Sequence, residues 1–121
     1  MNRDIVRNFW DKMSNQKFDE LSSYFKEDCF VYWPNTGEVF SVKEYIHVNK
    51  IYPGNWKIEI KRLEVCNEVI ISVVKIYSDE ENISLHATSF FTFENHKIAR
   101  LEEYFGLDED PPIWRNNKEI R

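Results

Sequence analysis

The spacing of apolar and polar residues changes partway along the chain. Over residues 5–13 the apolar side chains recur at helical spacing, and a shorter run over residues 18–25 repeats it. Ser41 and Glu44 match a capping box, which predicts a third helix starting at this point. From Trp56 onward apolar and polar residues mostly alternate, which is typical of β-strands. The sequence therefore predicts helices early in the chain and strands in its second half.

The predicted strands are separated mostly by short turns, and strands joined in this way pair antiparallel. They cover residues 29–33, 39–40, 56–65, 69–77, 83–93 and 97–106. A change of parity at Arg62 predicts a bulge or a sharp twist within the third of them. The economical arrangement is an α+β fold, in which a cone-shaped barrel of curved antiparallel sheet is closed by about three N-terminal helices.

The length of 121 residues suits one domain, so we expect a single domain over residues 1–121. Residues 107–121 are expected to form an irregular tail, since Pro111 and Pro112 exclude a helix there. Aromatic residues make up 16% of the chain, a share that suits the walls of a small-molecule pocket as well as a core.

The net charge of −5, with no run of Lys and Arg, argues against binding to nucleic acid or to an anionic membrane surface. No apolar run approaches the length of a membrane span, and we expect a cytoplasmic protein. Cys29 and Cys66 are expected to be reduced, partly buried thiols, with a disulfide between them as the alternative. His47, His86 and His96 lack the spacing of metal ligands, and nucleotide-binding motifs are missing. We therefore expect neither a metal nor a cofactor.

Glu103 is the residue that fits its surroundings least. It shares the more apolar parity of the last strand with Ala99, Leu101 and Phe105, and this parity is expected to face inward. A carboxylate among apolar side chains is costly unless it is paired, hydrogen-bonded or protonated. Two interpretations stay open. In the first, the carboxylate is hydrated at the sheet edge or is bonded to a buried Trp or Tyr. In the second, it is a pocket group with a raised pKa that acts as a catalytic base or a ligand anchor.

A set of aromatic residues and one amide complete the candidate site. Trp and Tyr carry N–H and O–H groups that need partners when buried, and a pocket with a few polar tips would supply them. Core packing and, for the amide, simple surface exposure are the alternatives. The candidate ligand-binding residues are Tyr32, Trp33, Tyr45, Asn49, Tyr52, Trp56, Phe91, Phe105 and Trp114.

Several short segments, spread over nearly the whole chain, carry a resemblance to a known family. They are Phe9-Trp10, Trp33-Pro34-Asn35-Thr36-Gly37-Glu38, Asn49-x-x-Tyr52-Pro53-Gly54-x-Trp56, Ser89-Phe90-Phe91, Lys97-Ile98, Glu103-Tyr104-Phe105 and Pro112-Ile113-Trp114-Arg115. In these segments and in the order of its elements the chain resembles the SnoaL-like branch of the nuclear-transport-factor-2-like (NTF2-like) superfamily.

This resemblance implies an NTF2-like, cystatin-like cone of sheet with an inward pocket, often dimerised through the outer face of the sheet. Family members include polyketide cyclases, ketosteroid isomerase relatives, dehydratases and small proteins without known activity. Their pockets commonly hold an Asp or a His–Asp pair, and Glu103 lies near where the acid of the last strand would fall. Leu101 stands where a cyclase-like pattern often has His, which speaks against a cyclase mechanism.

Three functions follow from these observations. Glu103 could abstract a proton next to a carbonyl in an isomerase, cyclase or dehydratase, with a small apolar or aromatic molecule as substrate. The same pocket could bind such a molecule without catalysis. Alternatively, the chain could act through a homodimer face on the outer side of the sheet, where Phe90 is out of place if solvated. Whether the chain is an enzyme is left open, because a fold does not assign chemistry.

Overall fold

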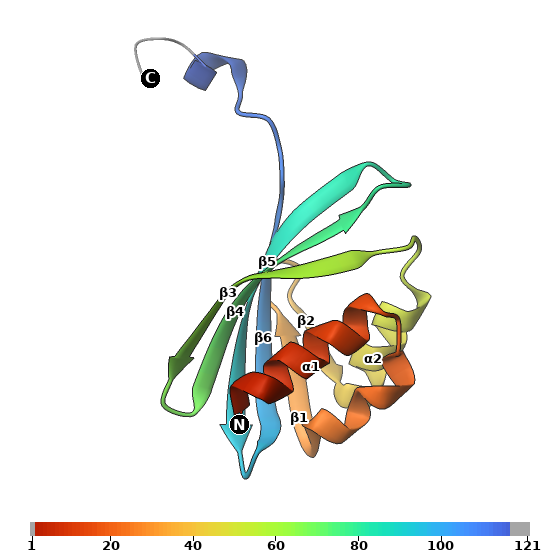
Figure 1. Ribbon diagram of the computed structural model, residues 1–121, viewed down its shortest axis with the longest axis vertical. Helices are drawn as coiled ribbons and strands as arrows, with labels where there is room; N and C mark the ends of the chain where they lie inside the picture. The colour runs from red at the N-terminus through yellow and green to blue at the C-terminus, as the bar shows by residue number, and fades with distance from the viewer. Residues whose placement is uncertain (1, 117–121) are drawn as a thin grey trace.

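The computed structural model describes residues 2–116 and shows a six-stranded sheet that curves around two α-helices (Figure 1). In chain order the elements are α1 (Asn2–Ser14), the 3₁₀ turns η1 (Phe18–Glu20) and η2 (Ser22–Tyr24), β1 (Phe25–Trp33), β2 (Glu38–Ser41), α2 (Val42–Ile51), β3 (Lys57–Cys66), β4 (Val69–Ser78), β5 (Ile83–Glu94), β6 (Lys97–Leu107) and the 3₁₀ turn η3 (Ile113–Asn116). The strands lie in the order β2-β1-β6-β5-β4-β3.

The predicted α+β class, with a curved sheet covered by helices on one side, is confirmed, but two details of the sheet differ. The pair β1 and β6 is parallel, whereas the other neighbouring strands are antiparallel. The sheet is also open, since β2 and β3 lie at opposite ends of its strand order. Turn lengths predict only which consecutive strands pair, so they could not reveal that β1 lies beside the last strand.

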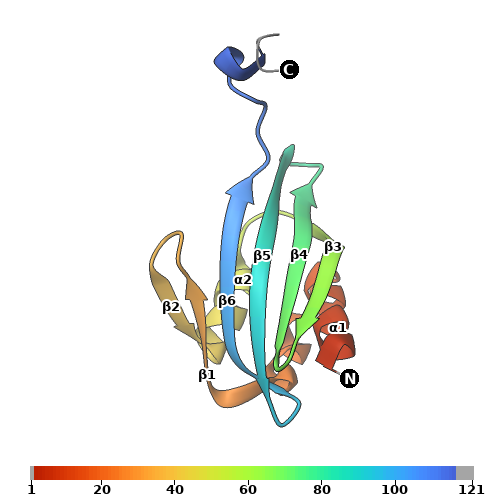
Figure 2. The ribbon, with the colours of Figure 1, turned by 90° about the vertical axis from the view of Figure 1, so that its left-hand side faces the viewer.

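The helices and the sheet enclose one apolar core. Helix α1 contacts β3 and β4, and helix α2 contacts β1 and β2. Figure 2 views the sheet from its outer face, with both helices behind it. The predicted apolar face of α1 is buried, namely Val6, Phe9, Trp10 and Met13. Burial of such large side chains is the main stabilising contribution to a fold of this size.

Residues 18–25 do not form the predicted second helix. Two single 3₁₀ turns take its place, closed by hydrogen bonds from the Leu21 amide to the Phe18 carbonyl and from the Tyr24 amide to the Leu21 carbonyl. A run of this length is too short to sustain an α-helix by itself. Phe25, which the helical spacing had included, instead begins β1 and pairs with Ile98.

Two bulges in the antiparallel part of the sheet set which side chains face the core, and a further register shift lies between Phe25 and Phe30 in the β1–β6 pair. Ile60 pairs with Val74 and Arg62 with Val73, so Lys61 is an extra residue, as the parity change at Arg62 predicted. The second bulge, at Ala99 in β6, was not predicted. Thr92 pairs with Arg100 and Phe93 with Ile98, so Ala99 is left over.

The bulge in β6 corrects the sequence interpretation of its first residues. Ala99 had been assigned to the inward parity, yet Ile98 is the residue that is completely buried at this point. Leu101 and Glu103 lie beyond the bulge and are buried as expected.

The start of α2 and the segment after β6 both bear on predictions from the sequence. The capping box is confirmed, since Glu44 N–H donates to the Ser41 hydroxyl and Ser41 N–H donates to the Glu44 carboxylate.

The predicted tail is irregular over residues 108–112, but Ile113–Asn116 forms a 3₁₀ turn directly after Pro111-Pro112, because proline is tolerated where a helix begins. The rest of the predicted tail, 117–121, lies outside the described residues. Within residues 2–116, none of the helices combines the length and apolar composition that crossing a membrane requires.

Candidate functional site

A row of polar residues crosses the inner face of the sheet. Glu103 on β6 lies directly opposite Ser89 on β5, and Ser89 lies opposite Ser72 on β4. The relative exposure of Glu103 is 2%, and both serines are completely buried. Because every second residue of a strand faces the same side, this register brings a carboxylate and two hydroxyl groups into an otherwise apolar core.

Side chains from three further elements reach the Glu103 carboxylate. The Trp33 indole N–H on β1 donates to Oε1 over 3.0 Å, and the Ser89 hydroxyl donates to Oε2 over 3.1 Å. The hydroxyl of Tyr45, on α2, also bonds to the carboxylate. All three donors are neutral. Hydrogen bonds alone therefore satisfy the carboxylate. The groups that affect its pKa include no positively charged side chain.

Burial raises the pKa of Glu103, and it outweighs the three hydrogen bonds, each of which lowers the pKa of this carboxyl. Burial is also the main reason why the pKa of Tyr45 lies well above its usual range, and the neighbouring charge of Glu103 adds to the effect. Tyr45 therefore stays protonated and acts as the donor. The pair combines an acid that ionises reluctantly with a hydroxyl that keeps its proton.

Trp33, which bonds to the carboxylate, packs against two further aromatic rings, and we call the three rings the aromatic cover: Trp33, Phe40 and Phe105. The Trp33 ring meets Phe40 and Phe105 edge-on, with ring centres 4.7 and 5.2 Å apart. All three rings are half-buried, whereas Glu103 is almost fully enclosed. A molecule approaching Glu103 from this side has to displace part of the aromatic cover.

The structure brings together four of the predicted site residues around Glu103. Trp33 and Tyr45 bond to the carboxylate directly, and Phe105 belongs to the aromatic cover. Asn49 lies one turn beyond Tyr45 on α2, where its amide donates to the Tyr45 carbonyl over 2.9 Å and its side chain also bonds to the Tyr45 side chain. Asn49 therefore contacts the cluster through Tyr45.

Two other predicted residues lie in the sheet, away from the carboxylate. Tyr32 sits on the outer face, with the Arg100 guanidinium 4.3 Å from its ring centre. Neighbouring residues of a strand face opposite sides, so Tyr32 and Trp33 do not line one pocket. Phe91 is completely buried and packs edge-on against Phe9, with ring centres 5.3 Å apart. Its place is in the core.

The remaining predicted residues lie beyond the ends of α2 and β6. Tyr52 and Trp56 pack on each other with ring centres 5.8 Å apart, and the Trp56 indole N–H donates to the Pro53 carbonyl over 2.8 Å. Tyr52 is more than half exposed, as is Trp114 in the tail. These three residues form no part of the cluster around Glu103.

Sequence reasoning missed the serines. Ser89 shares the inward parity of residues 83–93, so a small polar side chain facing the core was the available signal, but its partner followed only from the strand register. Ser72 accepts a hydrogen bond of 3.0 Å from the Trp10 indole N–H, and both groups are buried. The Trp10–Ser72 pair is a second polar contact within the core. It adjoins the Glu103 cluster, because Ser72 on β4 pairs with Ser89 on β5.

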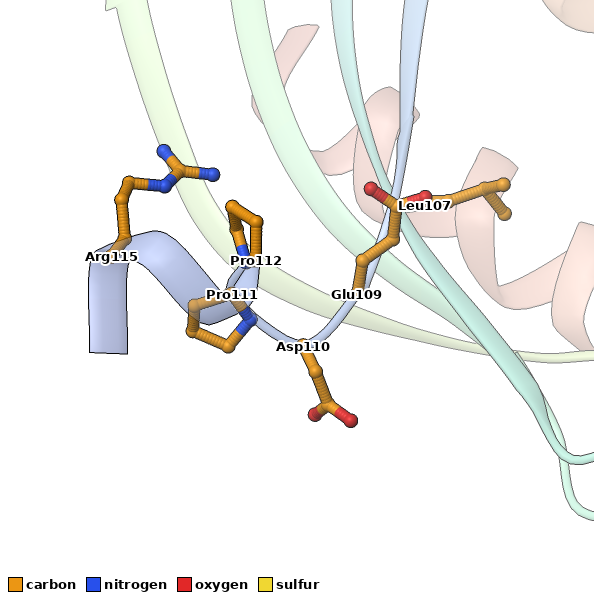
Figure 3. A pocket seen from close by; sticks show the side chains of 6 residues that line it. All are labelled: Leu107, Glu109, Asp110, Pro111, Pro112 and Arg115. Atoms are coloured by element: carbon orange, nitrogen blue, oxygen red, sulfur yellow. The ribbon is translucent and has the colours of Figure 1, made fainter. Parts of the chain in front are cut away.

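Neither of two hollows on the surface of residues 2–116 is lined by Glu103 or its donors. One, of about 430 Å³, lies between the 3₁₀ turns, the start of β1 and the start of α2. The other, of about 350 Å³, lies between the end of β6 and the tail (Figure 3). The predicted aromatic-lined pocket around Glu103 therefore stays a prediction. Within residues 2–116, no group of three or more His, Cys, Asp and Glu side chains is placed to hold a metal ion.

The chain combines a curved open sheet, helices on the inner face of that sheet and an acid buried between the sheet and the helices. No protein-family model matches the sequence, and no curated protein matches it either. The matches are solved structures. A provisionally assigned ketosteroid isomerase from Kribbella flavida has a TM-score of 0.82 at 21% identity, covering 94% of this chain and 84% of that one.

Two further structures show the same fold. An NTF2-like protein of unknown function from Burkholderia xenovorans has a TM-score of 0.82 at 20% identity, covering 95% of this chain and 90% of its own. A provisionally assigned SnoaL-like polyketide cyclase from Jannaschia has a TM-score of 0.75 at 8% identity, covering 86% and 84%. At these identities the likeness establishes the fold, which is NTF2-like, as the sequence resemblance implied.

Proposed function

We propose that the chain binds a small apolar or aromatic carbonyl compound and acts on it by proton abstraction, as an isomerase or lyase. The observation that carries this proposal is Glu103, an almost fully buried carboxyl whose pKa is raised by burial and whose partners are all neutral. Groups of this kind cluster at functional sites. The similar fold of proteins provisionally assigned as a ketosteroid isomerase and a polyketide cyclase supports the same class of chemistry.

In the proposed reaction a C–H bond next to the ligand carbonyl breaks. The proton passes to a Glu103 oxygen, and the electron pair delocalises toward the carbonyl oxygen. The Tyr45 hydroxyl keeps its proton and transfers its single hydrogen bond from Glu103 to that oxygen as negative charge develops there. Return of the proton from Glu103 to another carbon completes an isomerisation, and loss of a leaving group instead completes an elimination.

The ligand class follows from what surrounds the carboxylate. A ligand that replaces part of the aromatic cover meets the rings of Trp33, Phe40 and Phe105 and one carboxyl group. A flat, largely apolar molecule with a single carbonyl matches these groups.

The free thiols of Cys29 and Cys66 suit a reducing compartment, and we place this activity in the cytoplasm.

The test uses a minimal substrate, 3-cyclohexenone, whose isomerisation to the conjugated 2-cyclohexenone is followed by ultraviolet absorbance. Glu103→Gln is expected to abolish turnover. The matched control is Glu102→Gln, because Glu102 faces the other side of the sheet and bonds to Tyr104 and Arg100. Equal rates for the wild type and Glu103→Gln would remove the catalytic proposal.

Binding without catalysis is the alternative use of the same site. A ligand that binds only the folded state raises the melting temperature in proportion to the logarithm of its concentration. Stabilisation by 2-cyclohexenone that disappears in Glu103→Gln, together with no turnover by the wild type, would favour this alternative.

The outer face of the sheet supports a second proposal, a homodimer. Phe90 meets Tyr104 edge-on, with ring centres 6.0 Å apart, beside Ile71 and Val73 on β4. Phe30 on β1 is 51% exposed on the same face, with the Arg100–Glu102 ion pair of β6 lying between it and Phe90. Apolar surface such as that around Phe90 is typical of protein interfaces. Light scattering should give twice the chain mass for the wild type and the chain mass for Phe90→Lys; a monomeric wild type would contradict the proposal.

A further inference from the structure

The turn between β1 and β2 is tied to β6 by the side chain of Asn35. Its amide N–H donates to the Phe105 carbonyl over 3.2 Å, and its amide oxygen accepts from the Phe105 N–H over 2.9 Å. A primary amide carries a donor and an acceptor side by side, so one Asn satisfies both backbone groups of a single residue. We call these two hydrogen bonds the Asn35 bridge.

The Asn35 bridge keeps the register of β1 and β6 past their last backbone pair. Tyr32 and Glu102 form that pair, and Asn35 and Phe105 have the same separation of 70 positions. Figure 2 shows the two strands side by side. The amide side chain therefore takes the place that a further peptide group of β1 would have in the ladder.

The backbone of the turn is engaged elsewhere. The Trp33 carbonyl accepts from the Thr36 N–H over 3.1 Å and from the Gly37 N–H over 2.8 Å, so it is used within the turn. Pro34 has no N–H to donate. Gly37 has a φ of 78°, which glycine adopts readily, and the chain leads from there into β2. Within residues 2–116, Asn35 supplies the hydrogen bonds that join residues 34–37 to β6.

The Asn35 bridge acts on the strand ends that carry the candidate site. Trp33 lies two residues before Asn35, and Phe105 lies two residues after Glu103. The bridge therefore fixes the end of β1, from which the Trp33 indole N–H reaches the carboxylate over 3.0 Å, against the strand that holds this carboxylate. It also fixes the Trp33 ring beside the Phe105 ring, with centres 5.2 Å apart. Supporting hydrogen bonds of this kind hold the groups of a functional site in place.

We propose that Asn35 is a positioning residue of the candidate site, because the Asn35 bridge holds the Trp33 indole against the Glu103 carboxylate. The catalytic consequence rests on the proposed function, whereas the positioning itself needs no substrate. Asn35 is exposed, so the bridge competes with water and opens without unfolding of the core. When it opens, the end of β1 moves and the bond from Trp33 to Glu103 weakens.

A weaker Trp33 bond changes how tightly Glu103 holds its proton. The hydrogen bonds from Trp33, Tyr45 and Ser89 each lower the pKa of Glu103, against the larger effect of burial. On the elements packed around the carboxyl, the other titratable groups are the Tyr45 hydroxyl of α2 and the Cys29 thiol of β1, which interacts with Tyr45. Burial raises the pKa of both, so both are protonated at neutral pH. Loss of the Asn35 bridge is therefore expected to raise the pKa of Glu103 further.

The first experiment is deuterium exchange of the tryptophan indole N–H groups of the full chain, followed by NMR. Asn35→Ala is expected to speed exchange at Trp33 about fivefold, the effect of losing one net hydrogen bond. Trp10 is the internal reference, because its indole N–H bonds to the buried Ser72 and reports opening of the core. Its exchange rate is expected to stay the same. Equal acceleration at Trp33 and Trp10, or none at Trp33, would overturn the positioning role.

Two control variants isolate the Asn35 bridge. Thr36→Ala removes a hydroxyl that bonds within the same turn, and Asn55→Ala removes an exposed amide that bonds elsewhere on the surface. Both are expected to leave exchange at Trp33 at the wild-type rate. An effect of Thr36→Ala as large as that of Asn35→Ala would mean that the turn alone, without the bridge, positions Trp33.

The second experiment titrates the Glu103 carboxyl carbon by NMR, with Glu103→Gln to assign its resonance. In Asn35→Ala the acid dissociation constant of this carboxyl is expected to fall about threefold relative to the wild type. An unchanged or increased constant contradicts the positioning role. The two proposals fail separately, since a wild type that does not turn over 3-cyclohexenone refutes the proposed function and leaves both NMR results in force.

Discussion

Trp33 and Glu103 are 70 positions apart in the sequence, yet the indole N–H of one donates to the carboxylate of the other over 3.0 Å. The parallel pairing of β1 and β6 makes this contact possible, since it places the end of β1 beside the middle of the last strand. The Trp33–Glu103 bond ties the aromatic cover to the carboxylate beneath it. Any ligand that reaches Glu103 through the cover competes with this bond.

Glu103→Ala should destabilise the fold by about 3 kcal/mol, because it leaves buried donors without an acceptor and creates a cavity. The donors concerned are the N–H of Trp33 and the hydroxyls of Tyr45 and Ser89. Urea denaturation of both proteins at neutral pH measures the difference. An Ala variant as stable as the wild type would mean that solvent already satisfies these donors.

The pH dependence of stability should carry a signature of Glu103. Its folded-state pKa is raised above the ordinary value of 4.5, so the folded state holds this proton more tightly than the unfolded chain does. The contribution to stability is complete below about pH 4.5 and is lost as the pH rises through the folded-state pKa. The wild type should therefore lose stability relative to Glu103→Gln over this range. A constant difference between the two denaturation profiles would contradict the raised pKa.

Ser72→Ala should cost about 1 to 3 kcal/mol of unfolding free energy, because it removes the acceptor of the buried Trp10 N–H with little change in volume. Thr88→Val is the control, since Thr88 is a half-buried residue on the outer face of β5. Chemical denaturation of both variants measures the contrast. Equal effects at the two positions would show that the Trp10–Ser72 bond does not contribute.

His96→Gly should raise the unfolding free energy by about 0.5 to 1 kcal/mol. Asn95 and His96 form the turn between β5 and β6 with φ of 50° and 63°, and a non-glycine residue is disfavoured in this region. The variant gives up the contact of 3.3 Å between His96 Nδ1 and the Asn2 side chain, which is exposed and weak. A lower melting temperature in calorimetry would show that this contact outweighs the backbone strain.

Local patterns in the sequence predicted much of the fold. Alternation placed Glu103 on the inner face, a change of parity located the bulge at Arg62, and the capping box located the start of α2 at Ser41. Each of these features depends on residues close together in the chain. Their physical causes, namely strand pleating and helix capping, act over a few residues.

The contacts of the candidate site needed the structure, because they join distant segments. Tyr32 and Trp33 were equal candidates by composition, and only the pairing of β1 with β6 shows that one faces Arg100 and the other Glu103. Ser89 became part of the site through its register with Glu103. Long-range register depends on the packing of the whole sheet and leaves little trace in a single segment.

The central claim is that Glu103 is a buried carboxyl bonded to Trp33, and the most direct test is the indole N–H resonance of Trp33 followed by NMR against pH. The Trp33→Phe variant assigns this resonance among the four tryptophans. The account predicts that it shifts with a midpoint above 4.5 and that the titration disappears in Glu103→Gln. A Trp33 resonance that stays constant with pH, or that titrates identically in Glu103→Gln, would contradict it.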